Sequence, residues 1–218
     1  AGKAYLILGS SLAASTSTTI DLSNADFAFI GESANDSAGS SVSTAGDVDG
    51  DGLDDIIVGA PYNDAGESNA GKAYVLLGST LAVSSSTTID LGNADFEFIG
   101  TDPNSWAGWS VSTAGDVDGD GLSEILVGQP RTYYGTSYGG AGIVLGSTLA
   151  SSASPTINLS EADFQFTGVL EQHQAGYSVS SAGDVNGDGL DDILVGASYT
   201  NEGIPSAPDE VYLILSQL

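Results

Sequence analysis

The sequence predicts an all-β protein made of β-propeller blades, each with four antiparallel strands. One basis is a repeat: the same segment recurs three times, and its first aspartate is Asp47, Asp116 and Asp184, which are 69 and 68 residues apart. The other basis is that each copy contains short strand-like stretches and no useful stretch with helical periodicity. Because one four-stranded blade cannot cover both of its faces, we expect neighbouring copies to pack on one another.

The strands of one copy follow in a fixed order. Strand one reads SVSTAGDV and alternates between apolar and polar residues, and strand two reads DDIIVGAP, an apolar run typical of a strand buried on both faces. Strand three reads KAYVLLG and is rich in aromatic and β-branched residues, and strand four is of the type DFAFIG. A Ser/Thr-rich stretch such as 79–88 joins strands three and four, and we expect it to be a surface connection.

The whole chain is therefore predicted to be one repeat array. We place the first repeat at 31–99, the second at 100–167 and an incomplete third at 168–218, with 1–30 forming strands three and four of a preceding blade. The last blade then lacks its fourth strand. Two interpretations stay open. Either the chain is the C-terminal part of a longer propeller, or its N-terminal strands complete the last blade of another copy, in a closed homo-oligomer or an open filament.

Composition limits the possible partners. The chain has 29 acidic and 3 basic residues and a formal net charge of −26, so it repels phosphate backbones and anionic lipid, and we expect no nucleic acid as a partner. Its apolar runs are far shorter than the ~20 residues that span a bilayer, which predicts no membrane span. It has no cysteine, which excludes disulfides, zinc thiolate sites and cysteine nucleophiles.

The strongest chemical signal is the pattern D-x-D-x-D-G-x-x-D between strands one and two. Carboxylates alternate along the loop, and glycines let the backbone turn around a central point. Oxygen-only ligands on a flexible turn suit a hard cation, and Ca²⁺ fits better than Mg²⁺ because it accepts about six to eight oxygens in loose geometry. The ligands predicted for three Ca²⁺ sites, with each leucine acting through its main-chain carbonyl, are Asp47, Asp49, Asp51, Leu53 and Asp55; Asp116, Asp118, Asp120, Leu122 and Glu124; and Asp184, Asn186, Asp188, Leu190 and Asp192.

The three loops are not identical. Glu124 is longer by one methylene than the aspartate that closes the other two loops, so we expect an altered geometry or affinity at the second site. Asn186 removes one negative charge, which should weaken the third site.

Two alternatives to a dedicated metal loop were weighed. An EF-hand needs a bidentate glutamate at its twelfth position, but that position is Val58, Val127 or Val195, inside the apolar run of strand two, so the EF-hand is rejected. Asp-Gly pairs also form hairpin turns without metal. Three or more carboxylates packed into each loop would, however, repel one another in a bare turn, which favours a bound cation.

The repeats resemble FG-GAP repeats, which form the blades of the integrin α-subunit propeller and of many bacterial secreted proteins. The resemblance covers essentially the whole chain, and its most specific part is the acidic loop followed by IIVGAP. It implies a β-propeller with Ca²⁺ at the loop positions named above. The chain departs from the family pattern at the FG position, which reads Ala-Gly in all three copies, and at the GAP position, which is intact only at 59–61. These departures give no support to integrin-type ligand recognition.

These observations predict a calcium-binding scaffold that is secreted or attached to the cell surface and serves adhesion, protein–protein contacts or self-assembly. We expect no enzymatic activity. The only histidine, His173, lies in a variable stretch without a nucleophile motif and is predicted to be a solvated loop residue. A hydrolase that uses paired carboxylates such as Asp54–Asp55 is a weaker hypothesis, because metal binding already explains those pairs.

Aromatic residues give a second functional hypothesis. Trp106, Tyr133, Tyr134 and Tyr138 cluster in and near the loop of the second repeat, where exposed rings could stack on sugars or anchor a protein partner. The alternative function is therefore a lectin-like, carbohydrate-binding module. Trp109 takes the place of Ser40 and Tyr177 in the other copies and is predicted to serve blade packing.

Overall fold

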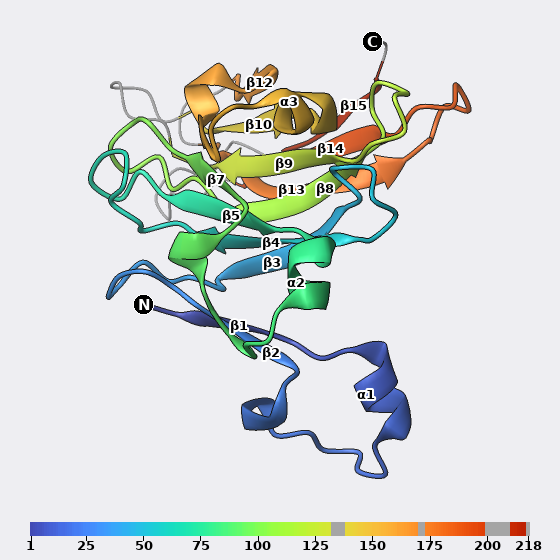
Figure 1. The fold of residues 1–218 in the computed structure, drawn as a ribbon. Coiled ribbons are helices and arrows are strands. Elements are labelled where there is room, and N and C mark those ends of the chain that lie inside the picture. Colours follow the sequence, from blue (N-terminus) through green and yellow to red (C-terminus); the bar gives the residue numbers. More distant parts are fainter. Residues whose placement is uncertain (132–137, 170–172, 199–209, 217–218) are drawn as a thin grey trace.

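The computed structural model describes residues 1–131, 138–169, 173–198 and 210–216. Four sheets are stacked face to face in chain order (Figure 1). No helix in the described part of the chain is long and apolar enough to cross a membrane. The all-β prediction is confirmed, and in the described ranges the stack does not close into a ring, as expected of an incomplete propeller.

The two central sheets are complete blades. In both, strands one to four pair antiparallel in the predicted order. The first complete blade consists of β3 (Ser41–Gly46), β4 (Asp55–Ala60), β5 (Lys72–Leu76) and β7 (Phe96–Ile99). The second consists of β8 (Ser110–Gly115), β9 (Glu124–Gln129), β10 (Gly140–Val144) and β12 (Phe164–Thr167).

Each of the two end sheets holds only some of the four blade strands in the described residues. The N-terminal sheet holds strands three and four, β1 (Lys3–Leu6) and β2 (Phe27–Ile30). The C-terminal sheet holds strands one to three, β13 (Ala175–Gly183), β14 (Asp192–Ala197) and β15 (Glu210–Ile214). Strand three is thus present at both ends of the array.

The Ser/Thr-rich connections contain structure that the sequence did not predict. Each holds a six-residue α-helix and a single 3₁₀ turn, too short to leave a helical period in the sequence. The elements are α1 (Gly9–Ala14), α2 (Gly78–Val83), α3 (Gly146–Ser151), η1 (Leu22–Asn24), η2 (Leu91–Asn93) and η3 (Leu159–Glu161). The first aspartate of strand four fixes the helix start, since Asp95 accepts hydrogen bonds from the Leu77 amide (2.8 Å) and the Thr80 hydroxyl (2.8 Å).

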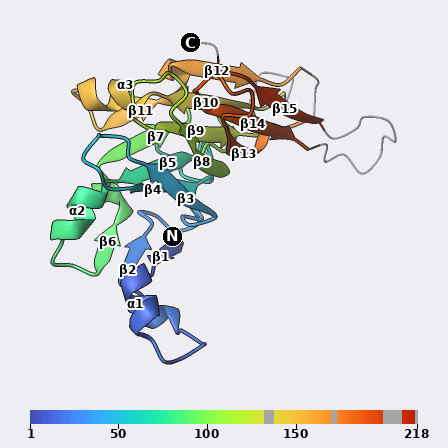
Figure 2. The ribbon, with the colours of Figure 1, turned by 90° about the vertical axis from the view of Figure 1, so that its right-hand side faces the viewer.

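The connections also link neighbouring blades. Two further strands, β6 (Thr88–Asp90) and β11 (Thr156–Asn158), pair in parallel with strand four of the preceding blade, β2 and β7 respectively. Figure 2 shows α2 and α3 on one edge of the stack, beside β6 and β11. Each of these connections therefore adds a strand to the sheet before it, the third strand in the N-terminal sheet and the fifth in the first complete blade.

The core lies between the sheets in three apolar clusters. Phe29 of the N-terminal sheet packs against Val58 and Tyr74 of the first complete blade. The other face of that blade, including Ile57, packs against Val127 of the second. The third cluster lies between the second complete blade and the C-terminal sheet, and includes Leu126, Ile143, Ile193 and Val195. Each complete blade thus buries two different apolar faces, which explains the continuous apolar run of its strand two.

The glycine that begins the GAP motif is explained by close contact between blades. A Cβ on Gly59 would lie 2.0 Å from the carbonyl oxygen of Gly108 in the next blade, so no larger residue fits. The Ser41 hydroxyl donates a 2.8 Å hydrogen bond to the same oxygen. The backbones of neighbouring blades therefore nearly touch at this point.

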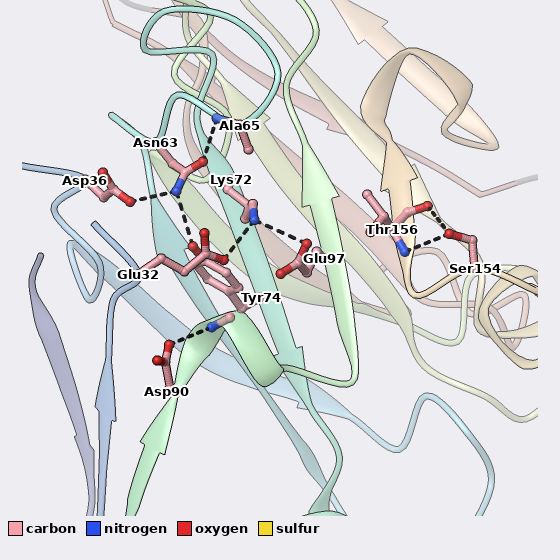
Figure 3. A network of polar contacts seen from close by, with 11 residues as sticks. Glu32, Asp36, Asn63, Ala65, Lys72, Tyr74, Asp90, Glu97, Ser154 and Thr156 are labelled. Atoms are coloured by element: carbon pink, nitrogen blue, oxygen red, sulfur yellow. Dashed lines mark hydrogen bonds and ion pairs between the residues drawn. The ribbon is translucent and has the colours of Figure 1, made fainter. Parts of the chain in front are cut away.

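A buried charged network lies between the first two sheets (Figure 3). Lys72 is 3% exposed, and its Nζ lies 2.9 Å from Glu32 Oε1 and 3.2 Å from Glu97 Oε2. Beside it, Asn63 Nδ2 donates to the Tyr74 hydroxyl at 3.4 Å. Burial, reinforced by Glu32, raises the pKa of the Tyr74 phenol far above its ordinary value, so this side chain stays neutral.

Candidate functional site: three acidic loops and an aromatic cluster

Three acidic loops join strands one and two of successive blades. We call them the first loop (47–55), the second loop (116–124) and the third loop (184–192). They lie on one side of the stack, to the right in Figure 1. In the first loop Gly50 and Gly52 have φ of 78° and 86°, a left-handed backbone that a side chain would strain, and the matching glycines of the other loops do the same.

The first acid of each loop organises the turn. Asp47 Oδ1 accepts from the Gly50 amide at 2.7 Å, and Oδ2 accepts from the Gly52 amide at 2.9 Å. Asp116 and Asp184 accept the equivalent amide hydrogen bonds in the other loops. The sequence assigned these acids only as ligands, but their carboxylates also hold the loop closed.

The closing acid of the first loop is buried and fully bonded. Asp55 is 1% exposed, and its two oxygens accept from the amides of Val48 (2.9 Å) and Gly78 (2.8 Å). Burial raises the pKa of Asp55, with these two amides opposing the rise. Asp192 closes the third loop in the same way and accepts from the amides of Val185 (3.0 Å) and Ser216 (3.0 Å).

The closing acid of the second loop is different. Glu124 is completely buried, and its Oε2 accepts from the Val117 amide at 2.6 Å. Its Oε1 has no hydrogen-bond partner among the described residues. Burial, followed by the charges of Asp118 and Asp116, raises the pKa of Glu124 to about 8, and the Val117 and Gly146 amides oppose this rise only in part. A buried carboxylate oxygen that lacks a hydrogen bond can accept a cation or a proton.

The acidic side chains converge in two of the loops. In the second loop, ligand oxygens of Asp116, Asp118, Asp120 and Glu124 lie within 4.8 Å of one another. In the first loop the converging group is Asp47, Asp49 and Asp55, without Asp51. The third loop, where Asn186 replaces an acid, forms no such group of three acids in the described ranges.

The donor chemistry fits a hard cation. Every converging side chain offers carboxylate oxygen, and no cysteine exists in the chain to offer sulfur. Burial, followed by the charges of Asp51 and Asp47, raises the pKa of Asp49 as well. The positions aligned with an EF-hand glutamate, Val58, Val127 and Val195, are at most 2% exposed within strand two, which agrees with the rejection of that motif.

An aromatic cluster spans three blades. Trp106 and Trp109 stack with ring centroids 5.1 Å apart, and the Trp109 ring lies 5.4 Å from that of Tyr177. Tyr62 of the first complete blade meets the Trp106 ring edge-on at 5.6 Å. The Arg131 guanidinium lies 4.1 Å from the centroid of Trp106. The backbone φ of Trp106 is 58°, an unusual value for a bulky residue.

The other predicted ligand-binding residues divide into two groups. Tyr133 and Tyr134 lie outside the described residues. Tyr138 is half-buried, and its carbonyl accepts from the Ala175 amide at 3.1 Å, but within the described ranges its ring makes no aromatic contact with the cluster. The sequence did not identify Tyr62, Arg131 and Tyr177 as members of the cluster, because they lie about 25 to 70 residues from Trp106 along the chain.

The prediction for His173 was wrong. This residue is 2% exposed rather than solvated, and its Nδ1 lies 3.9 Å from Glu210 Oε2 on β15. Glu210 lies 37 residues further along the chain, so this is a long-range contact that local sequence does not reveal. Glu210 also forms a hydrogen bond with Tyr212, which raises the pKa of that phenol to about 12.

Comparisons with known proteins agree with the repeats seen in the fold. A family model described as FG-GAP repeat matches residues 38–76, 107–145 and 175–208. Among curated proteins, the chain is 31% identical to integrin alpha-PS5 of Drosophila melanogaster over 170 residues, which is 78% of this chain and 16% of that protein. It is 32% identical to integrin alpha-PS2 of the same organism over 72% of this chain and 11% of that protein.

A relative with a different name is also similar. The chain is 29% identical to phosphatidylinositol-glycan-specific phospholipase D of Bos taurus over 73% of this chain and 18% of that protein. The chain thus spans less than a fifth of the length of each of these relatives.

Proposed function

The chain belongs to the FG-GAP repeat family, and we propose that it is a calcium-stabilised β-propeller scaffold for adhesion or protein–protein contact outside the cell. The observation that carries the calcium proposal is the second loop. There a completely buried glutamate oxygen without a hydrogen-bond partner among the described residues belongs to a group of four acids. An ionised, unpaired carboxylate at this depth is costly, and a bound cation removes that cost.

The ligands proposed for each ion are those derived from the sequence, the leucine carbonyls included. Ca²⁺ suits them better than Mg²⁺ because the loops offer several carboxylates on a glycine-rich turn, whereas Mg²⁺ requires near-octahedral geometry and keeps several waters. We rank the second loop as the tightest site, since it gathers four acids, and the third as the weakest, since Asn186 supplies a neutral oxygen.

Two considerations support a position outside the cell. The relatives named integrin alpha suggest a surface setting for this chain too. In addition, extracellular calcium is abundant enough to fill sites with dissociation constants of about 10⁻⁴ to 10⁻³ M. A chain of net charge −26 without cysteine would gain its cross-links from the ions rather than from disulfides.

The proposed role is not catalytic. The only histidine is buried beside Glu210, and the paired carboxylates of the hydrolase hypothesis lie in the acidic loops. The name phospholipase D describes a relative of which this chain spans 18% of the length, so its activity is not transferred here.

The aromatic cluster is proposed as a contact surface for a protein partner. The Trp106 ring already stacks with Trp109 and with the Arg131 guanidinium, which leaves little ring face for a sugar. The cluster combines large rings with an arginine, the residue types that dominate protein–protein contacts. A glycan partner is the alternative, and a glycan array distinguishes the two.

Self-assembly stays a proposal with a structural condition. Both β1 and β15 are copies of strand three, so the N-terminal strands of one chain can complete the C-terminal blade of another only if one of these two strands leaves its place. Sedimentation at micromolar concentration tests this. A monomeric mass contradicts assembly and leaves the calcium proposal untouched.

Thermal unfolding with and without calcium tests the main proposal. Each ion that binds only the folded state adds about 2.7 kcal/mol at a hundred times its dissociation constant, so Ca²⁺ should raise Tm strongly and EGTA should reverse the rise. Because any salt screens a charge of −26, the control is K⁺ at equal ionic strength. An equal Tm in Ca²⁺ and in the K⁺ control would overturn the proposal.

A further inference from the structure

Hydrogen bonds join the acidic loops of neighbouring blades. The Ser123 amide of the second loop donates to the Asp47 carbonyl of the first loop at 2.8 Å. The Asp191 amide of the third loop donates to the Asp116 carbonyl of the second loop at 2.9 Å. In both links the acceptor is the main chain of a first acid, and the donor is the residue immediately before a closing acid. Each link therefore joins the start of one loop to the end of the next.

The link between the second and third loops is double. Besides accepting from Asp191, Asp116 donates its own amide to Asp191 Oδ2 at 3.0 Å. Gly115 makes room for this carboxylate, since a Cβ there would lie 2.0 Å from Asp191 Oδ2. The equivalent of Asp191 in the second loop is Ser123, and within the described residues its hydroxyl makes no hydrogen bond to Asp47. The first link is therefore single.

Apolar contacts accompany both links. Leu122 Cδ2 lies 3.0 Å from the point where a Cβ on Gly50 would sit, and Leu190 Cδ2 lies 3.1 Å from the same point on Gly119. Each leucine thus covers the glycine turn of the preceding loop. The loops form a continuous row of contacts rather than three separate turns.

We propose that adjacent loops bind calcium cooperatively, and that coupling is stronger between the second and third loops than between the first and second. This inference rests on the proposed calcium function. Asp116 is a ligand through its side chain and is bonded twice to Asp191 through its main chain. An ion that fixes Asp116 also orders Asp191 and the closing acid Asp192 that follows it. The next ion then binds a loop that is already ordered, so less conformational entropy is lost on binding.

Repulsion between two dications opposes this coupling. It acts through solvent between exposed loops and is screened at physiological salt, where the Debye length is about 8 Å. Charge-assisted hydrogen bonds such as that from the Asp116 amide to Asp191 are short-range and much less sensitive to salt. In a calcium titration at about 0.15 M salt, the hydrogen bonds between the loops should therefore outweigh the repulsion between the ions.

Calorimetric calcium titration of the full chain tests the proposal. The substitution D49A, at one of the converging acids, disables the first loop and leaves a two-site protein. Adding D188A leaves only the second loop, and adding D120A instead leaves only the third. The two-site protein should bind its ions with a combined affinity at least about fivefold above the product of the two single-site affinities. The substitution D191S, which copies Ser123, removes the side-chain bond and keeps the main-chain one, so it should reduce this excess to what a single link provides.

Two further variants separate the hydrogen bond from charge. D191N removes the charge but keeps an oxygen that accepts the Asp116 amide, and it should retain most of the excess affinity. D54S removes one charge at the equivalent position of the first loop, where the side chain is exposed and makes no hydrogen bond within the described ranges, and it should leave coupling unchanged. Equal loss in D191N and D191S would overturn the hydrogen-bonded coupling.

The outcomes distinguish this inference from the proposed function. Single-site variants that bind calcium, with a two-site affinity equal to the product of the two, would overturn coupling and leave calcium binding intact. No heat of binding in any variant, with the chain folded by circular dichroism, would overturn the calcium proposal itself.

Discussion

In the first complete blade, β5 presents Lys72 and Tyr74 to the preceding sheet, whereas the second complete blade has Gly140 and Gly142 at the same two register positions. The partner strand differs to match, with Glu97 in the first blade and Gln165 in the second. One interface is therefore held partly by a buried charged network, which the second blade does not have at these positions. The same strand topology tolerates both solutions.

The acidic loops of the two complete blades also differ, in how many hydrogen bonds their closing acids accept. The first loop closes with Asp55, whose two oxygens each accept an amide, and the second closes with Glu124, which has one oxygen without a partner in the described ranges. The closing acid of the first loop is thus satisfied by protein groups, while that of the second keeps one carboxylate oxygen for the proposed ion or for a proton. Repeats with nearly the same sequence therefore differ in whether the protein satisfies the closing acid of the loop.

Removing the buried ammonium should have the largest effect. K72A leaves Glu32 and Glu97 as uncompensated carboxylates at the interface, which should destabilise the fold by about 3–5 kcal/mol in urea unfolding. The matched control is K3A, the same strand position in β1, where Lys3 is exposed and the change should stay within about 0.5 kcal/mol. Equal losses in both would show that the network does not hold this interface.

The second test concerns pH in the presence of EGTA. The folded pKa of Glu124, about 8, lies above its ordinary value of 4.5, so the folded state holds a proton that the unfolded state releases. The stabilising contribution is complete below pH 4.5 and is lost as pH rises to about 8, with a slope of up to about 1.4 kcal/mol per unit.

Two comparisons sharpen the pH test. E124Q cannot ionise and should remove this part of the slope, whereas calcium should reduce it in the unsubstituted chain by binding the ionised form. E124D, which gives the second loop the closing acid of the first, should give an intermediate slope. An unchanged slope in E124Q would contradict the proposed burial of this charge.

The smallest expected effect is at the aromatic cluster. W109S gives the second blade the residue that the first has at Ser40 and removes ring contacts with Trp106 and Tyr177, which should cost about 2 kcal/mol in urea unfolding in calcium. S40A, at the exposed equivalent position, should change stability by less than about 0.5 kcal/mol. If W109S left the free energy of unfolding unchanged, the Trp109 ring would not contribute to blade packing and would serve partner contact instead.

Much of the fold could be predicted from local patterns. The strands carry their period and their apolar runs in stretches of four to six residues, and β3, β4, β5 and β7 lie where those patterns place them. The acidic loops could also be predicted from the sequence, because the acids and glycines of each loop lie within nine residues. The parallel strand β11 was missed, because its partner β7 is about 60 residues away and three residues carry no pattern of their own.

The sequence by itself determined the repeat, the order of strands in a blade and the oxygen-rich loops, since each depends on residues close together in the chain. Tertiary structure alone decided which closing acid keeps an unpartnered oxygen, which lysine is buried between carboxylates and how one loop bonds to the next. The ion pairs and loop links join residues about 25 to 75 positions apart, and burial there depends on how two blades pack together. The energy of a buried charge depends on how much water it loses. That loss is set by the packing of one blade on the next, so it cannot be read from the neighbouring residues in the sequence.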